Sequence, residues 1–80
     1  IRPDQWDILR RAKKVITAYE NMEELIRLGA YRRGSDPAVD EAIKLYPQIE
    51  AFLNQNKHEN TPIEEGFAAL ALILGMPYNG

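Results

Sequence analysis

The chain has 80 residues, no cysteine, one histidine and a formal net charge of −2. This length corresponds to a single domain and is too short for a typical ATP-consuming enzyme. Without cysteine, the chain can form neither a disulfide framework nor a thiolate metal site. Its longest strongly apolar run, Phe67 to Leu74, is far short of the ~20 residues that a membrane-spanning helix needs. No signal peptide is recognisable and Ile1 is not an initiator residue, so we expect a piece of a longer chain.

The net charge hides an asymmetry between the two halves of the chain. Residues 1–34 carry eight Lys or Arg and five Asp or Glu, whereas residues 35–80 carry two and seven. A basic first half is compatible with a nucleic-acid or acidic protein partner. The simpler interpretation is that Arg10, Arg11, Lys13 and Lys14 form the solvated face of an amphipathic helix.

The first helix is predicted over residues 4–28, with Asp4 as the N-cap. Apolar side chains at alternating four- and three-residue steps form one seam, widened on one flank. These residues are Ile8, Ala12, Val15, Tyr19, Met22 and Ile26 in the seam and Leu9, Ile16 and Leu25 beside it. A seam this wide predicts packing within the domain rather than a coiled coil. Trp6 is either an edge residue of the core or part of a contact with an upstream domain.

A ten-residue stretch, Leu28 to Pro37, separates the first two apolar-periodic segments. Gly29 can adopt a positive φ and end the first helix. Asp36 can cap the next helix, and Pro37 suits its first position because no N–H is needed there. We therefore predict a tight turn between two helices. Its tip displays Tyr31, Arg32 and Arg33.

The second helix is predicted over residues 37–54, with a kink or break near Tyr46 and Pro47. A proline inside a helix removes one backbone bond and costs ~3 kcal/mol. The apolar phase nevertheless continues across it, which predicts two helical halves on one face. The residues that keep this phase are Val39, Ala42, Ile43, Tyr46, Ile49, Phe52 and Leu53. The polar stretch from Asn54 to Asn60 is predicted to be a loop.

The third helix is predicted over residues 62–74. Thr61 and Glu64 form a capping-box pattern around Pro62. The run from Phe67 to Leu74 is apolar almost all round, so either the other helices wrap it or a neighbouring domain covers its far side. Gly75 and Pro77 end the helix. Residues 1–80 are thus predicted to form one all-α domain, a small three-helix bundle.

The sequence contains no motif of catalytic or cofactor chemistry. It has no phosphate-binding Gly-rich loop with lysine and no nucleotide fingerprint between a strand and a helix. His58 lies in the polar loop without a nearby nucleophile, which favours a solvated side chain. Glu64 and Glu65 are adjacent on a helix, point to different faces and suit the helix dipole. We therefore assign no catalytic, cofactor-binding or metal-binding residue.

One set of segments resembles a known family. The segments are Leu25-Ile-Arg-Leu-Gly-Ala-Tyr-Arg-Arg-Gly-Ser-Asp-Pro37, Asp40-Glu-Ala-Ile43 and Ile49-Glu-Ala-Phe-Leu-Asn-Gln55. They are similar to the C-terminal helical domain of the flagellar and type III secretion export ATPases, relatives of the catalytic subunits of F-type rotary ATPases. The resemblance covers about residues 9–72, and the Gly-Ala-Tyr…Gly-Ser-Asp-Pro turn is its specific part.

The resemblance implies a homohexameric ATPase that energises protein export at the cytoplasmic face of the inner membrane. ATP and Mg²⁺ would bind to a preceding nucleotide-binding domain, so no catalytic residue or cofactor is expected in this piece. The helical domain would contact that domain, a central coiled-coil stalk and export chaperone–substrate complexes, with neither nucleic acid nor a membrane span involved. Whether the parent serves a flagellum or an injectisome stays open.

By position, the resemblance implies that the turn from Gly29 to Asp36 faces the stalk. The partner-binding residues would be Tyr31, Arg32, Arg33, Ser35 and Asp36, with Gly29, Gly34 and Pro37 shaping the turn. Rotary synthases carry an acidic tip here, so the two arginines imply an acidic or polar contact on the stalk. Two simpler interpretations remain: a solvated tip for the arginines, and a packing anchor for Tyr31.

A second function of another class also fits the sequence. The chain could be a free-standing helical module that binds nucleic acid or protein through its basic first helix. A phosphate loop some hundreds of residues upstream of Ile1 would decide for the export ATPase.

Overall fold

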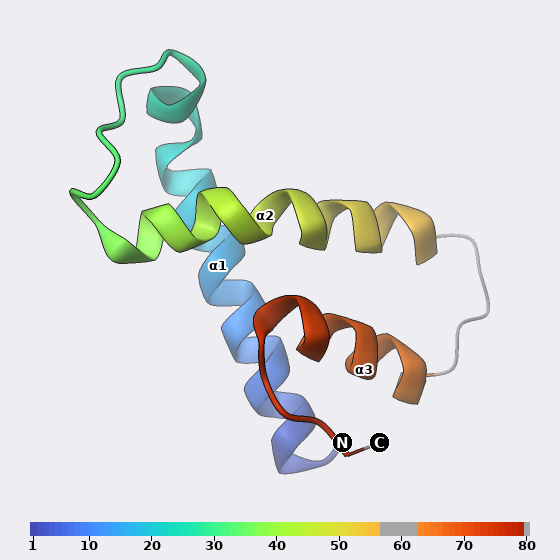
Figure 1. Cartoon of the computed structure of the whole chain (residues 1–80). Helices are drawn as coiled ribbons and strands as arrows, with labels where there is room; N and C mark the ends of the chain where they lie inside the picture. The colour runs from blue at the N-terminus through green and yellow to red at the C-terminus, as the bar shows by residue number, and fades with distance from the viewer. Residues whose placement is uncertain (57–62, 80) are drawn as a thin grey trace.

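The computed structural model describes residues 1–56 and 63–79. These residues form three α-helices and no strand: α1 (Pro3–Arg27), α2 (Pro37–Asn56) and α3 (Ile63–Leu74) (Figure 1). The prediction of a small all-α bundle is confirmed. His58 lies outside the described residues. So do Thr61 and Pro62, which make up most of the predicted capping box.

Helix α1 begins one residue earlier than predicted, and its N-cap is Arg2 rather than Asp4. Pro3 takes the first helical position, which its fixed φ and missing N–H suit. The Arg2 backbone N–H donates to Oε1 of Gln5 at 3.0 Å. Asp4 lies inside the first turn, where its carboxylate accepts the N–H of Gln5 at 2.9 Å. The predicted N-cap was wrong because Pro3 fixes the start of the helix.

The core forms where α2 and α3 pack on the N-terminal half of α1. Its buried side chains come from all three helices: Ile8, Ala12, Val15, Ala42, Leu45, Ile49, Leu70, Ala71 and Leu74. The second half of the α1 seam is only half-buried at Tyr19, Met22 and Ile26. In α2, Leu45 is buried, whereas Leu53 is 53% exposed. The last turns of α2 extend past its crossing with α1, so Leu53 has little to pack against (Figure 1).

Helix α2 runs continuously through Pro47 and ends at Asn56. Of the two forms predicted for this segment, the structure excludes the break. The helix is held on both sides of the proline, because Leu45 and Ile49 are buried and Tyr46 stacks on Tyr19. The start of the predicted loop is wrong, since residues 54–56 are still helical.

Helix α3 buries one face and leaves another open. Leu70, Ala71 and Leu74 are in the core, but Leu72 is 82% exposed. The other two helices therefore do not wrap α3. Of the two predicted alternatives, the one that stays is a neighbouring domain that covers the far side of the helix. The helix ends at Gly75, whose φ of 70° allows the Met76 N–H to reach the carbonyl of Ala71 at 2.9 Å.

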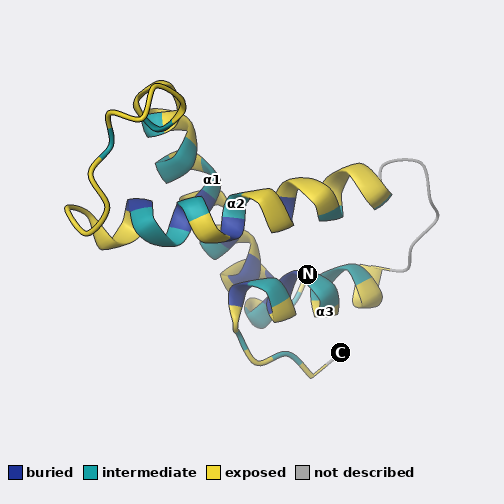
Figure 2. Ribbon diagram, turned by 45° about the horizontal axis from the view of Figure 1, so that its top comes forward, coloured by how far each residue is buried: buried dark blue, intermediate teal, exposed yellow. Residues whose placement is uncertain are grey.

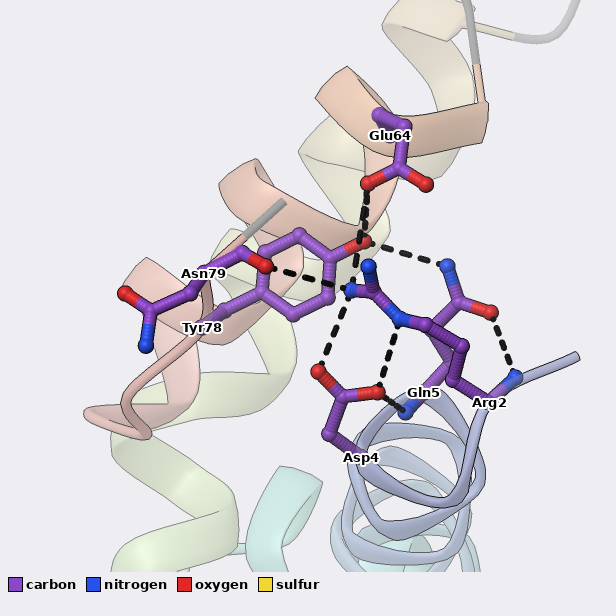
Figure 3. A network of polar contacts seen from close by, with 6 residues as sticks. All are labelled: Arg2, Asp4, Gln5, Glu64, Tyr78 and Asn79. Carbon is purple, nitrogen blue, oxygen red and sulfur yellow. Dashed lines mark hydrogen bonds and ion pairs between the residues drawn. The ribbon is translucent and has the colours of Figure 1, made fainter.

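A polar network joins the start of α1 to the C-terminal tail (Figure 3). The Tyr78 hydroxyl donates to Glu64 at 2.6 Å and accepts from Nε2 of the buried Gln5 at 3.1 Å. Arg2 pairs with Asp4, and its guanidinium lies 5.1 Å from the centre of the Tyr78 ring. Glu64 thus serves this network and does not act as half of a carboxylate pair with Glu65.

The molecule is elongated along α1. Its radius of gyration is 13.7 Å and its extents are 40 × 26 × 16 Å, whereas a compact chain of this length would have a radius near 12 Å. The α1–α2 turn lies at one end of α1, and both chain ends lie at the other (Figure 1). The residues of the turn are mostly exposed (Figure 2). The turn thus projects about 38 Å, the length of 25 helical residues, from the start of α1.

The raised pKa of Tyr46 predicts a loss of stability at high pH. Burial raises the pKa of Tyr46, with further contributions from Glu50, Glu20 and Glu23. Because the pKa is higher in the folded state, its stabilising effect is complete below the unfolded pKa of ~10 and disappears as the pH rises through the folded pKa. Tyr46→Phe retains the ring on Tyr19 and should unfold with a shallower pH dependence above pH ~10. Urea unfolding followed by circular dichroism from neutral to alkaline pH measures this, and parallel curves for the two proteins would refute it.

Candidate partner-binding turn

The turn begins where α1 ends at a glycine in the left-handed conformation. Leu28 is the C-cap, and Gly29 has a φ of 71°. This geometry lets the N–H of Ala30 reach the carbonyl of Leu25 at 2.8 Å and the N–H of Gly29 reach that of Ile26 at 3.1 Å. These two bonds satisfy carbonyls that the last turn of a helix leaves free. The structure thus places Gly29 where the sequence predicted the end of the first helix.

The turn ends at a capped start of α2. Oδ1 of Asp36 accepts the N–H of Ala38 at 3.0 Å, and Pro37 is the first residue of the helix. The first helical backbone bond runs from the N–H of Asp40 to the carbonyl of Asp36 at 2.9 Å. Asp36 is therefore engaged as a cap, in the position that the sequence predicted.

The carboxylate of Asp40 holds the two ends of the turn together. Its two oxygens lie 3.2 and 3.0 Å from the backbone nitrogen of Gly34, which has a φ of 89°. The hydroxyl of Tyr31 donates to Oδ1 of Asp40 at 2.7 Å and accepts the N–H of Asp36 at 3.3 Å. Partial burial and the bond to Asp40 raise the pKa of Tyr31 above its ordinary value.

Sequence reasoning did not assign Asp40 to the site. The available signal was the spacing of Asp40, which lies four residues after the N-cap Asp36. This spacing places the Asp40 carboxylate one helical turn after the cap, on the side close to the preceding loop. Tyr31 is half-buried and bonded within the turn, in agreement with the anchor interpretation. Ser35 is also engaged locally, because its hydroxyl donates to the carbonyl of Arg32 at 2.6 Å.

The side chains of Arg32 and Arg33 are exposed and make no hydrogen bond or ion pair with any residue in the described ranges. Arg33 lines a shallow hollow with Asp40, Ile43 and Lys44. Of the five residues predicted to bind a partner, three thus hold the turn. The other two are the arginines at its tip, whose side chains have no partner among residues 1–56 and 63–79. The turn presents a basic surface on a backbone that its own bonds fix.

The rest of the described chain offers no alternative chemistry. Residues 1–56 and 63–79 contain no cluster of three or more His, Cys, Asp or Glu that could hold a metal ion. The same residues include no helix long and apolar enough to cross a membrane.

Comparison with known proteins decides the family. The family model for the T3SS EscN ATPase C-terminal domain matches residues 1–71. The chain belongs to this family. It is a C-terminal domain of the export ATPases, as the turn motif indicated.

Individual relatives of the export ATPase domain come from flagellar and secretion systems. A flagellum-specific ATP synthase of Caulobacter vibrioides is 54% identical over 95% of the chain and 17% of its own length. One from Bacillus subtilis is 42% identical over 86% of the chain and 16% of its own length. A type 3 secretion system ATPase of Pseudomonas syringae pv. tomato is 40% identical over 79% of the chain and 14% of its own length. No solved structure matches the chain significantly.

The export ATPase domain therefore spans about one sixth of the length of these relatives.

Proposed function

We propose that this domain couples ATP hydrolysis in a preceding nucleotide-binding domain to a central stalk and to docking of export chaperone–substrate complexes. The parent would be a homohexameric ATPase at the cytoplasmic face of the inner membrane, with ATP and Mg²⁺ bound outside this piece. The observation that carries the proposal is a pair of exposed arginines, Arg32 and Arg33, to which no other described residue is paired. They lie on a turn fixed by its own hydrogen bonds.

The geometry supports transmission of movement through the turn. The α1–α2 turn lies at the opposite end of α1 from both chain ends (Figure 1). Because a continuous helix is stiff, displacement at the N-terminal end of α1 would move the turn as a body. The bonds of Asp40 to Gly34 and Tyr31 would limit how much of that movement the turn itself absorbs.

The charge of the tip favours a stalk surface that carries carboxylates. Exposed ion pairs contribute only ~0.2–1 kcal/mol each. Such pairs steer association and fix its register more than they add affinity. The two arginines are therefore expected to select the partner. Apolar contacts, such as those of the half-buried Ile43 in the same hollow as Arg33, would supply further affinity.

Charge reversal at the tip tests this proposal. Arg32→Glu together with Arg33→Glu should leave the fold intact, because neither side chain has a partner within the described residues. We expect binding to the purified stalk protein to weaken about tenfold or more, since two favourable pairs become repulsive. Titration with fluorescently labelled stalk protein measures the change in Kd.

The matched control is Lys13→Glu together with Lys14→Glu, which changes the net charge by the same amount in the N-terminal half of α1, away from the turn. It should bind the stalk protein like the parent sequence. Unchanged binding by the tip variant, or equal weakening by both variants, would exclude the proposed contact.

A further inference from the structure

We propose that a groove along α1 is a second binding surface, separate from the turn, and that it binds an acidic amphipathic helix of a partner protein. The α1 groove is bounded by α1, the first turns of α2 and Met76 of the C-terminal tail. On α1 it extends from Asp7 to Asn21, a length of about 21 Å. This length matches about four turns of a partner helix.

We call the apolar lining of the α1 groove its floor, and most of its side chains are small. It is lined by Val15 and Ala18 of α1, Ala38 of α2 and Met76. Val15 belongs to the core, so the floor is continuous with the packed interior. Small residues allow a partner helix to approach closely, and methionine adapts its shape to different apolar side chains. A groove of this kind fits the apolar stripe of an amphipathic helix.

The rim of the α1 groove carries an excess of positive charge that no other described residue balances. Arg10 pairs with Asp7, and Arg11 pairs with Glu41 of α2. Lys13 and Lys14, which also line the groove, have no ion-pair partner within the described residues. The chain as a whole has a net charge of −2, so this basic rim is local. Carboxylates flanking the apolar stripe of a partner helix would meet these two lysines.

The same features disfavour nucleic acid as the occupant. A phosphate backbone needs a row of donors, whereas the floor of the α1 groove is apolar. Two carboxylates, Asp7 and Glu41, also line the groove. They also occupy the two arginines that would otherwise bind phosphate best. The α1 groove is therefore suited to a protein helix.

A pair of synthetic peptides tests the inference. Both peptides are helix-favouring, about 14 residues long, with leucines at helical i, i+3, i+4 and i+7 spacing. One carries glutamates beside the leucine stripe and the other carries lysines at the same positions. Fluorescence anisotropy should show that the acidic peptide binds the chain at least tenfold more tightly than the basic one. Equal affinities, or tighter binding of a duplex RNA than of the acidic peptide, would overturn the inference.

Variants then locate the site. Lys13→Glu with Lys14→Glu should reduce binding of the acidic peptide at least tenfold, whereas Arg32→Glu with Arg33→Glu should leave it unchanged. Ala38→Glu is a second, independent variant. It places a carboxylate in the groove at the second position of α2, where the helix dipole favours it, so the fold should be retained. If neither groove variant weakens binding, the peptide binds elsewhere and the proposal fails.

This inference does not depend on the stalk contact. Both double variants are measured in the stalk-binding experiment and in the peptide-binding experiment. Each surface therefore serves as the control for the other. Loss of stalk binding only in the tip variant, together with loss of peptide binding only in the groove variants, would establish both surfaces. Failure in one experiment leaves the other result intact.

Discussion

Replacement of Ile49 by alanine is expected to lower the free energy of unfolding by about 2–5 kcal/mol, the range for removing a large aliphatic side chain from a core. Ile49 is 1% exposed and lies two residues after Pro47, in the part of α2 that faces the core. A chain of this length has a total stability of only about 4–12 kcal/mol. The variant should therefore be largely destabilised, as measured by urea unfolding followed by circular dichroism.

The control for this prediction is Leu53→Ala, one helical turn further along α2. Leu53 is 53% exposed, so truncation should change stability by no more than about 0.5 kcal/mol. The comparison also tests the placement of α2, because the apolar pattern alone assigns both residues to the same face. Similar losses for the two variants would contradict the observed crossing of α1 and α2.

Replacement of Asp40 by alanine is expected to disrupt the turn and weaken binding at its tip, although neither arginine is altered. The carboxylate accepts the N–H of Gly34 and the hydroxyl of Tyr31. Losing bonds to an ionised group costs roughly 1–3 kcal/mol, with the lower end expected here because the site is partly exposed. The tip loses its fixed geometry, so stalk binding should fall together with protection of the Gly34 amide from hydrogen exchange.

Two variants separate this effect from simple destabilisation. Asp36→Ala removes the N-cap of α2 at a cost of about 1 kcal/mol but leaves the Asp40 bonds in place. Asp40→Asn keeps an acceptor oxygen for either Gly34 or Tyr31 and should be intermediate between Asp40→Ala and the parent sequence. The role of Asp40 would be refuted if Asp36→Ala weakened stalk binding as much as Asp40→Ala.

The helices and the ends of the turn follow from local interactions, and so they could be predicted. Gly29 ends α1 because its backbone adopts a φ of 71° without a Cβ. Asp36 and Pro37 begin α2 because a cap and a fixed φ act within three residues. The start of α1 was missed for an equally local reason: Pro3 determined it more strongly than the capping preference of Asp4.

The sequence by itself therefore determined three helices, the position of the turn and the two arginines at its tip. Only the tertiary structure decided that Leu45 is buried while Leu53 is exposed, that Leu72 faces outward and that Gln5 bonds to Tyr78, 73 residues away. It also decided that Asp40 closes the turn on Gly34 and Tyr31. Periodicity shows which apolar side chains share one face of a helix. The way the helices cross decides which of these side chains pack against a neighbour. For this reason the exposed cations of the tip could be predicted, whereas the carboxylate that fixes the turn beneath them could not.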